Sequence, residues 1–186
     1  KCVYPFDFRL QVSFRLDRSR LTVQYDVFNV GTETMYFSIG SHPAFSIAFA
    51  GGSLEEYFIE FEQQEKDRRF FFVDGCLDTD TEPVFDNSRQ IFLSAHLFDR
   101  GPVILKDVVS RAIVIRRSRS ARSIRVKFDA PHVAIWSKPK RAPFVCIEPW
   151  WGLPDPIGFF KSLEQKPGIL PLAVNNVFST RYSIEV

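Results

Sequence analysis

The chain has 186 residues, enough for one domain with a substantial core and too few for two ordinary domains. Apolar residues make up 45% and charged residues 25%, a balance that excludes disordered and collagen-like proteins. The net charge of +2 is too weak to indicate nucleic acid or an anionic membrane as the main partner, and no transmembrane run or signal peptide is visible, so we expect a cytoplasmic protein.

The dominant hydrophobic period along the chain is two, which predicts antiparallel β-strands. Apolar and polar residues alternate from Phe6 to Leu16 and again from Leu21 to Val27, with a polar turn between the two stretches. Residues 4–29 are therefore predicted to form a hairpin with one face buried. The high count of 20 phenylalanines also favours half-buried pleated surfaces.

The rest of the chain is predicted to form short strands separated by turns. These strands are expected at 35–39, 57–61, 69–73, 91–93, 103–105, 112–116, 124–128, 133–136, 144–147 and 178–184. Residues 74–83 are polar and rich in turn formers, so a turn is expected there, and residues 161–166 are expected to make one helical turn. The spacing of the strands predicts an all-β sandwich or barrel-like domain with no linker in it.

Two polar features have structural interpretations. The basic run at residues 116–127 is interrupted by serines and lacks interleaved aromatic residues, so it is interpreted as a solvated hairpin tip and not as a nucleic-acid site. Cys2, Cys76 and Cys146 are far apart and form no CxxC pair, and the chain has only three histidines. We therefore expect reduced thiols and no zinc motif.

Two segments differ from ordinary sheet sequence. In residues 40–45, His42 follows a predicted strand and precedes a proline. The proline favours an extended conformation for His42, which holds the imidazole at a strand end. The alternative is a structural role, which is more common for a lone histidine. In residues 142–152, an apolar strand runs into Glu148, which is followed by a proline and two tryptophans.

Glu148 has two interpretations. Burying a carboxylate costs several kcal/mol unless it is paired, and aromatic rings beside a polar group are typical of sugar sites. The alternative is a surface glutamate before a turn. If His42 and Glu148 converge in the fold, they form an acid–base pair that needs no metal and no cofactor.

These segments, in this order, resemble those of the aldose 1-epimerases (galactose mutarotases), and are most similar to their LacX-like branch. The matching stretches cover essentially the whole chain: residues 4–6, Asn29 with Gly31, 38–45, 96–100, 135–139 and 142–152. The resemblance implies an all-β, galactose mutarotase-like β-supersandwich of antiparallel sheets. It also implies that residues 1–186 are a single domain, the C-terminal two-thirds of the family's full domain.

Full-length relatives in this family carry a further N-terminal portion with additional strands and sugar-binding polar residues. We expect the present chain to be truncated by that portion. The missing strands are expected to leave sheet edges and apolar surface exposed, which favours self-association.

The resemblance implies interconversion of the α and β anomers of an aldohexose, with no cofactor and no metal. His42 matches the family's general acid and Glu148 its general base. Asp99 matches a carboxylate that binds sugar hydroxyls. Trp136, Phe45 and Trp150 are expected to line the cleft as neighbours of matched motifs.

Two alternative functions stay open on the same fold. One is a non-catalytic carbohydrate-binding module that keeps the tryptophan-rich cleft without the chemistry. The other is a hexose-6-phosphate 1-epimerase, which would need an arginine cluster over the phosphate. The arginines at 116–127 are the candidates for that cluster, but we expect them to face away from the cleft.

Overall fold

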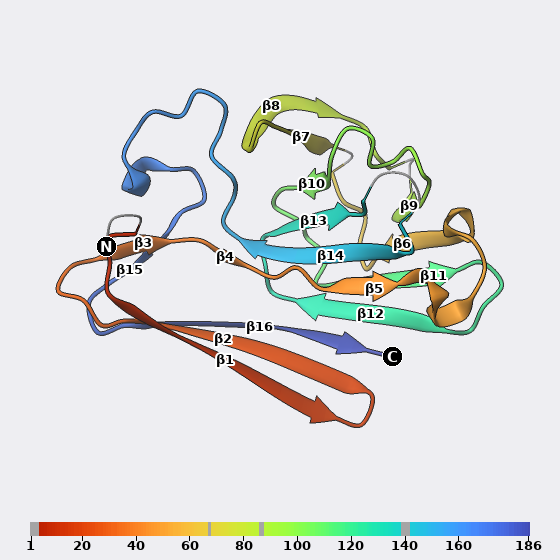
Figure 1. The fold of residues 1–186 in the computed structure, drawn as a ribbon, viewed down its shortest axis with the longest axis horizontal. Coiled ribbons are helices and arrows are strands. Elements are labelled where there is room, and N and C mark those ends of the chain that lie inside the picture. The colour runs from red at the N-terminus through yellow and green to blue at the C-terminus, as the bar shows by residue number, and fades with distance from the viewer. Residues whose placement is uncertain (1–3, 67, 86–87, 139–141) are drawn as a thin grey trace.

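Two antiparallel sheets make up most of the fold (Figure 1). The computed structural model describes residues 4–66, 68–85, 88–138 and 142–186. Within these ranges the first sheet has seven strands. In spatial order they are β1 (Phe8–Asp17), β2 (Arg20–Asn29), β16 (Val177–Glu185), β12 (Ser123–Phe128), β11 (Ala112–Arg117), β6 (Tyr57–Phe61) and β9 (Gln90–Phe92).

The second sheet carries the segments that the sequence singled out for chemistry. Two short strands, β4 (Ile39–Gly40) and β5 (Ala44–Ser46), pair with the same strand, β14 (Phe144–Trp151). Beyond β14 the order continues through β13 (His132–Trp136), β10 (Val103–Leu105), β7 (Arg69–Val73) and β8 (Cys76–Glu82). A separate two-stranded ribbon joins β3 (Met35–Phe37) to β15 (Leu170–Leu172).

The main core lies between the two sheets. Ile59, Ile113 and Val126 of the first sheet and Ile135 and Ile147 of the second are fully buried in one apolar cluster. Burying a side chain of this size contributes about 1.5–3 kcal/mol, so the two facing layers supply the main driving force for the sandwich. Because side chains alternate along a strand, the neighbours of Ile135 and Ile147 point to the opposite face of the second sheet.

Most of the predicted strands are present, with two corrections. Residues 74–83 were predicted to be a turn, but only residues 74–75 turn, and β8 then pairs with β7. The polar residues of β8 are tolerated because it is the last strand of its sheet, where, within the described chain, residues 155–157 meet its outer side only at Leu77. Residues 163–165 form the single turn expected at 161–166, a 3₁₀ turn.

The second correction concerns the hairpin of β1 and β2. The two strands pair along their whole length, as predicted, but the apolar face of β1 is not buried. Phe14 is 71% exposed and Leu16 is 75% exposed. The reason is that β1 is the edge strand of the first sheet, and in Figure 1 the hairpin projects away from the second sheet, which therefore does not cover it.

The helical segments of the described chain are three 3₁₀ turns: Ile47–Ala50 (η1), Leu54–Glu56 (η2) and Leu163–Gln165 (η3). None of them is long and apolar enough to cross a membrane.

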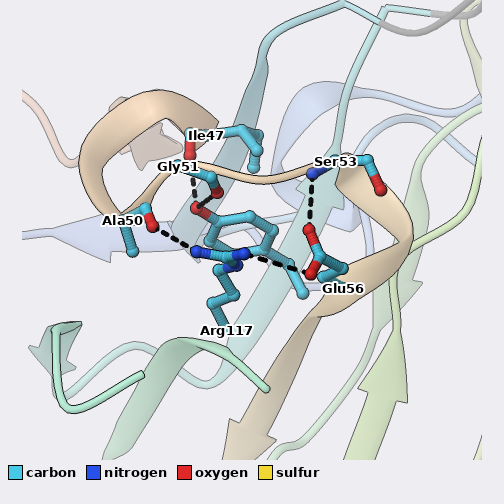
Figure 2. Close-up of polar contacts among 7 residues, drawn as sticks. Ile47, Ala50, Gly51, Ser53, Glu56 and Arg117 are labelled. Carbon is cyan, nitrogen blue, oxygen red and sulfur yellow. Dashed lines mark hydrogen bonds and ion pairs between the residues drawn. The ribbon is translucent and has the colours of Figure 1, made fainter. Parts of the chain in front are cut away.

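A set of polar contacts holds the chain that leaves β5 (Figure 2). The Arg117 guanidinium donates to the Ala50 carbonyl at 2.7 Å and to the Glu56 carboxylate at 3.1 Å. The Tyr57 hydroxyl lies within hydrogen-bond distance of two further carbonyls of this segment. These contacts fix residues 47–56 against the first sheet, and they anchor the chain immediately after the second sheet's β5.

The basic run at residues 116–127 forms the β11–β12 hairpin, as predicted. Its first two arginines are not simply solvated, because Arg116 pairs with Glu60 at 2.7 Å and Arg117 pairs with Glu56. This hairpin belongs to the first sheet, whereas the segments singled out for chemistry are in the second.

Candidate active site

One register relates β4 and β5 to β14, although three residues separate the two short strands. In β4, Gly40 pairs with Trp150, and β5 resumes the pairing without any shift. The register therefore places His42, in the interruption, directly opposite Glu148. Proline at position 43 supplies no N–H to a ladder, which accounts for the interruption at this point.

Backbone hydrogen bonds hold the interruption in place on both sides of His42. The Ser41 N–H donates to the Pro149 carbonyl at 3.1 Å, and the Ile147 N–H donates to the Pro43 carbonyl at 3.4 Å. The His42 backbone is therefore attached to a central strand of the sheet.

The structure brings together the two residues that the sequence singled out. His42 Nε2 lies 3.2 Å from Glu148 Oε1. The His42 side chain is 60% exposed, whereas the Glu148 side chain is only 6% exposed. The buried carboxylate is thus reached from solvent through an exposed imidazole, an arrangement that a substrate can approach from one side.

The protonation of Glu148 is unusual for a carboxyl group. Burial raises the pKa of Glu148 to about 7, while the nearby His42 and a hydrogen bond from the Trp150 side chain act in the opposite direction. A carboxyl group with a pKa near neutrality gains and loses protons under ordinary conditions, which suits general acid–base chemistry.

The tryptophans predicted to line the cleft lie near this pair. Trp136 of β13 is half-buried, and its ring meets the His42 ring edge-on, with centroids 5.8 Å apart. Trp150 lies two residues after Glu148 on β14, so both side chains point to the same face of the strand.

A cavity of about 240 Å³ borders Trp150 and is lined by residues 38–40 and 152–154. Trp150 therefore contacts both this hollow and, through its side-chain hydrogen bond, the Glu148 carboxylate. Gly40 permits the close packing, because a Cβ atom there would lie 2.8 Å from the Trp150 ring.

Phe45 requires a correction to the predicted cleft. Its side chain is buried in the main core between the sheets, and Phe45 pairs with Val145, another core residue. His42 and Phe45 are three positions apart, an odd spacing that puts their side chains on opposite faces of an extended chain. Phe45 therefore supports the sheet from behind and does not line the cleft.

Asp99 lies in a turn between β9 and β10, where its carboxylate is 2.9 Å from His96 Nδ1. Both side chains are more than half exposed. Among the contacts of the described residues, none joins Asp99 to His42 or Glu148. Its role in binding sugar hydroxyls stays a prediction.

One residue of this site was not identified from the sequence. Cys146 was interpreted only as a reduced thiol, yet its Sγ, the His42 ring and the Glu148 carboxylate lie within 4.8 Å of one another. Cys146 is fully buried and precedes Glu148 by two residues on one strand. That spacing was the available signal, because residues i and i+2 of a strand share a face. Cys76 is also a free thiol, and Cys2 lies outside the described residues.

Comparisons with known proteins agree with this architecture. Residues 1–176 match the aldose 1-epimerase family. The plasmid and chromosomal LacX proteins of Lactococcus lactis subsp. lactis are each 31% identical to the chain in an alignment of 189 positions that covers 98% of this chain and 63% of LacX.

Two solved structures share the fold closely. A galactose mutarotase related enzyme from Lactobacillus acidophilus superposes with a TM-score of 0.88 at 30% identity, over 98% of this chain and 62% of that one. A galactose mutarotase-like protein from Lactobacillus casei gives a TM-score of 0.87 at 29% identity, over 98% of this chain and 64% of that one. The chain spans less than two thirds of the length of each of these relatives. By its sequence and its fold, the chain belongs to the aldose 1-epimerase family.

Proposed function

We propose that the chain catalyses the interconversion of the α and β anomers of an aldohexose. The observation that carries this proposal is the pairing of His42 Nε2 with the Glu148 carboxylate at 3.2 Å, with the imidazole open to solvent. Membership of the aldose 1-epimerase family supports the same reaction class. The proposal includes Trp136 and Trp150 as apolar surfaces for the sugar ring and Asp99 as a partner for its hydroxyls.

In the proposed reaction, two groups act on the two oxygens attached to C1 of the pyranose. The Glu148 carboxylate removes the proton of the C1 hydroxyl, and the His42 imidazolium gives a proton to the ring oxygen. The bond between C1 and the ring oxygen breaks, and C1 becomes the carbon of an aldehyde. Rotation about the bond from C1 to C2 then presents the other face, and the ring closes with both proton transfers reversed.

The environments of the two groups support these roles. Glu148 is desolvated, so its carboxylate is a stronger base than one in water, as its raised pKa indicates. His42 extends into solvent beside it, where the imidazole can exchange its proton between turnovers. A cavity of about 240 Å³ borders Trp150, whose side chain hydrogen-bonds to Glu148, and it offers room for part of a ligand next to that tryptophan.

The hexose-phosphate alternative has less support. The arginines proposed for a phosphate lie on the β11–β12 hairpin of the first sheet, where Arg116 and Arg117 already pair with carboxylates. We therefore propose a neutral sugar as the substrate.

The test is the rate at which the optical rotation of freshly dissolved α-glucose or α-galactose relaxes. We expect the chain to accelerate the relaxation, and we expect His42→Ala and Glu148→Gln each to lose about 10²- to 10⁴-fold of that acceleration. Glu185→Gln is the matched control, because this carboxylate pairs with Arg20 on the first sheet and should leave the rate unchanged. Full acceleration in either site variant would contradict the proposal. Sugar binding by calorimetry without acceleration would indicate the carbohydrate-binding alternative.

A further inference from the structure

We propose that His42, Cys146 and Glu148 form a binding site for a single divalent cation of the Zn²⁺ class. The three residues offer one imidazole nitrogen, one sulfur and one carboxylate oxygen, all within 4.8 Å of one another. His42 Nε2 and Glu148 Oε1 are 3.2 Å apart. Tetrahedral Zn²⁺ with nitrogen and oxygen ligands at about 2.0 Å requires an edge of about 3.3 Å between them, so two of the ligands already stand at the required spacing.

The backbone explains why the three donors converge. Cys146 and Glu148 are two residues apart on β14, so both side chains leave the same face of the strand. His42 is held opposite Glu148 by the register that β4 and β5 share with β14. All three donors are therefore mounted on neighbouring strands of one sheet, which is the rigid support that a metal site needs.

The donor set and its exposure favour this class of cation. Sulfur with nitrogen and oxygen suits Zn²⁺ and its analogue Co²⁺, whereas Mg²⁺ and Ca²⁺ require oxygen ligands. Cys146 and Glu148 are buried, and His42 is exposed, so the cation would enter from the imidazole side. Three protein ligands leave a fourth position open on that side for water.

Binding would require the thiol proton of Cys146 to leave, together with the carboxyl proton of Glu148 wherever that group is protonated. Burial, together with the neighbouring Glu148, raises the pKa of the Cys146 thiol to about 12, so the free thiol keeps its proton. Coordination replaces that proton with the metal, and the proton passes to the buffer, while the carboxylate and the neutral imidazole bind through lone pairs. The thiolate and the carboxylate then balance the two charges of the cation.

Occupation of this site would block the acid–base pair. The cation takes the lone pair of His42 and the carboxylate of Glu148, which are the groups that the reaction uses. We therefore expect Zn²⁺ to inhibit the epimerase, a consequence that rests on the proposed function. The binding itself does not rest on it.

The experiment is a titration of the metal-free chain with Co²⁺, followed by competition with Zn²⁺. A Co²⁺–thiolate bond gives a charge-transfer absorption in the near ultraviolet, which reports sulfur ligation without any measurement of turnover. We expect one Co²⁺ per chain with this absorption. Mutation of a residue that only supports a metal ligand typically weakens metal binding by roughly 10- to 100-fold. Loss of a direct ligand should weaken it at least as much as the upper end of that range. We therefore expect His42→Ala to weaken Zn²⁺ binding by about 100-fold or more.

Three cysteine variants assign the sulfur. Cys146→Ser should remove the absorption, and Cys76→Ser and Cys2→Ser should keep it. Because Cys146 is fully buried, circular dichroism must first show that Cys146→Ser is folded. If that variant is unfolded, the metal affinity of His42→Ala tests the site instead, since the His42 side chain is exposed. His96→Ala is the matched histidine control, since His96 pairs with Asp99 and is not among the three donors of the proposed site.

The proposed site is overturned by three results. These are the absence of one-to-one binding, an absorption that persists in folded Cys146→Ser, and an affinity unchanged in His42→Ala. An active epimerase that binds no Co²⁺ would overturn the metal site and leave the proposed function standing. A chain that shows the full cobalt spectrum but no epimerase activity would overturn the proposed function and leave the metal site standing.

Discussion

Glu148 and His42 face each other across a single pair of antiparallel strands, with the carboxylate buried and the imidazole exposed. The strand that carries Glu148 is central, because β13 pairs with it on one side and β4 and β5 pair with it on the other. The base is thus fixed within the sheet, and the acid sits at an interruption of the neighbouring strand.

The first prediction concerns the pH dependence of the proposed activity. Glu148 acts as a base only when ionised, and burial raises its pKa to about 7. The value of kcat/KM should therefore fall about tenfold for each pH unit below 7, because each unit removes that fraction of the carboxylate. The measurement is polarimetry from pH 5 to 8 with a chelator present. A rate that stays constant down to pH 5 would show that the carboxylate is not the base.

The second prediction concerns Gly40. An alanine Cβ there would lie 2.8 Å from the Trp150 ring, and the rigid indole would have to move. Overpacking of this kind costs about 1–3 kcal/mol of unfolding free energy, and the displaced ring would no longer border the cavity as it does now. We expect Gly40→Ala to unfold at lower denaturant concentration and to bind sugar more weakly by calorimetry. Unchanged affinity in a folded variant would mean that Trp150 does not contact the sugar.

Much of the fold could be predicted because period-two alternation survives in individual strands. The alternation of β1 and β2 and the apolar run of β10 were sufficient to place those strands. The alternation did not identify β8, whose polar residues are tolerated at a sheet edge. Nor could it show that the apolar face of β1 is exposed, because burial of that face depends on whether the second sheet covers it.

The site was predicted in part for a similar reason. Side chains alternate between the two faces of an extended strand. This alternation puts Phe45 and His42 on opposite faces and Cys146 and Glu148 on the same face, so both facts could be predicted from the sequence. The pairing of His42 with Glu148 was implied by the family resemblance and not by strand alternation, because the two residues are far apart in the chain and only the register of β4 and β5 against β14 brings them together.

A third prediction uses the buried His132, at the start of β13. Its Nδ1 accepts a hydrogen bond from the Asp107 N–H at 3.1 Å, and only 8% of its side chain is exposed. Burial lowers the pKa of His132. Among the described residues, the charged groups that act on it are Asp107, which opposes the shift, and Lys106, which adds to it. The native protein therefore holds this imidazole neutral at a pH where the unfolded chain binds a proton.

The sign of the effect follows from that difference. The contribution of neutral His132 to stability is complete above the unfolded pKa of about 6.5, and it is lost as the pH falls through the lower pKa of the native state. We expect the free energy of unfolding to fall between pH 7.5 and 5 more steeply in the natural chain than in His132→Asn, whose amide oxygen can still accept the Asp107 N–H. Urea titrations at both pH values measure this, and parallel decreases in the two proteins would refute the assignment.

The fourth prediction concerns the uncovered face of β1. Phe14 and Leu16 are each more than 70% exposed on an edge strand, and this combination of apolar side chains and unpaired backbone favours pairing with a second copy of the chain. We expect the chain to self-associate with rising concentration in sedimentation velocity and Phe14→Lys to shift the equilibrium towards monomer. The unfolding free energy of the monomer should change by no more than about 0.5 kcal/mol, because a largely exposed side chain has little packing to lose.

Ser13→Lys adds the same charge to the other face of the strand and should leave the association unchanged. If both variants dissociate the chain equally, charge alone is responsible, and the apolar face is not the contact surface.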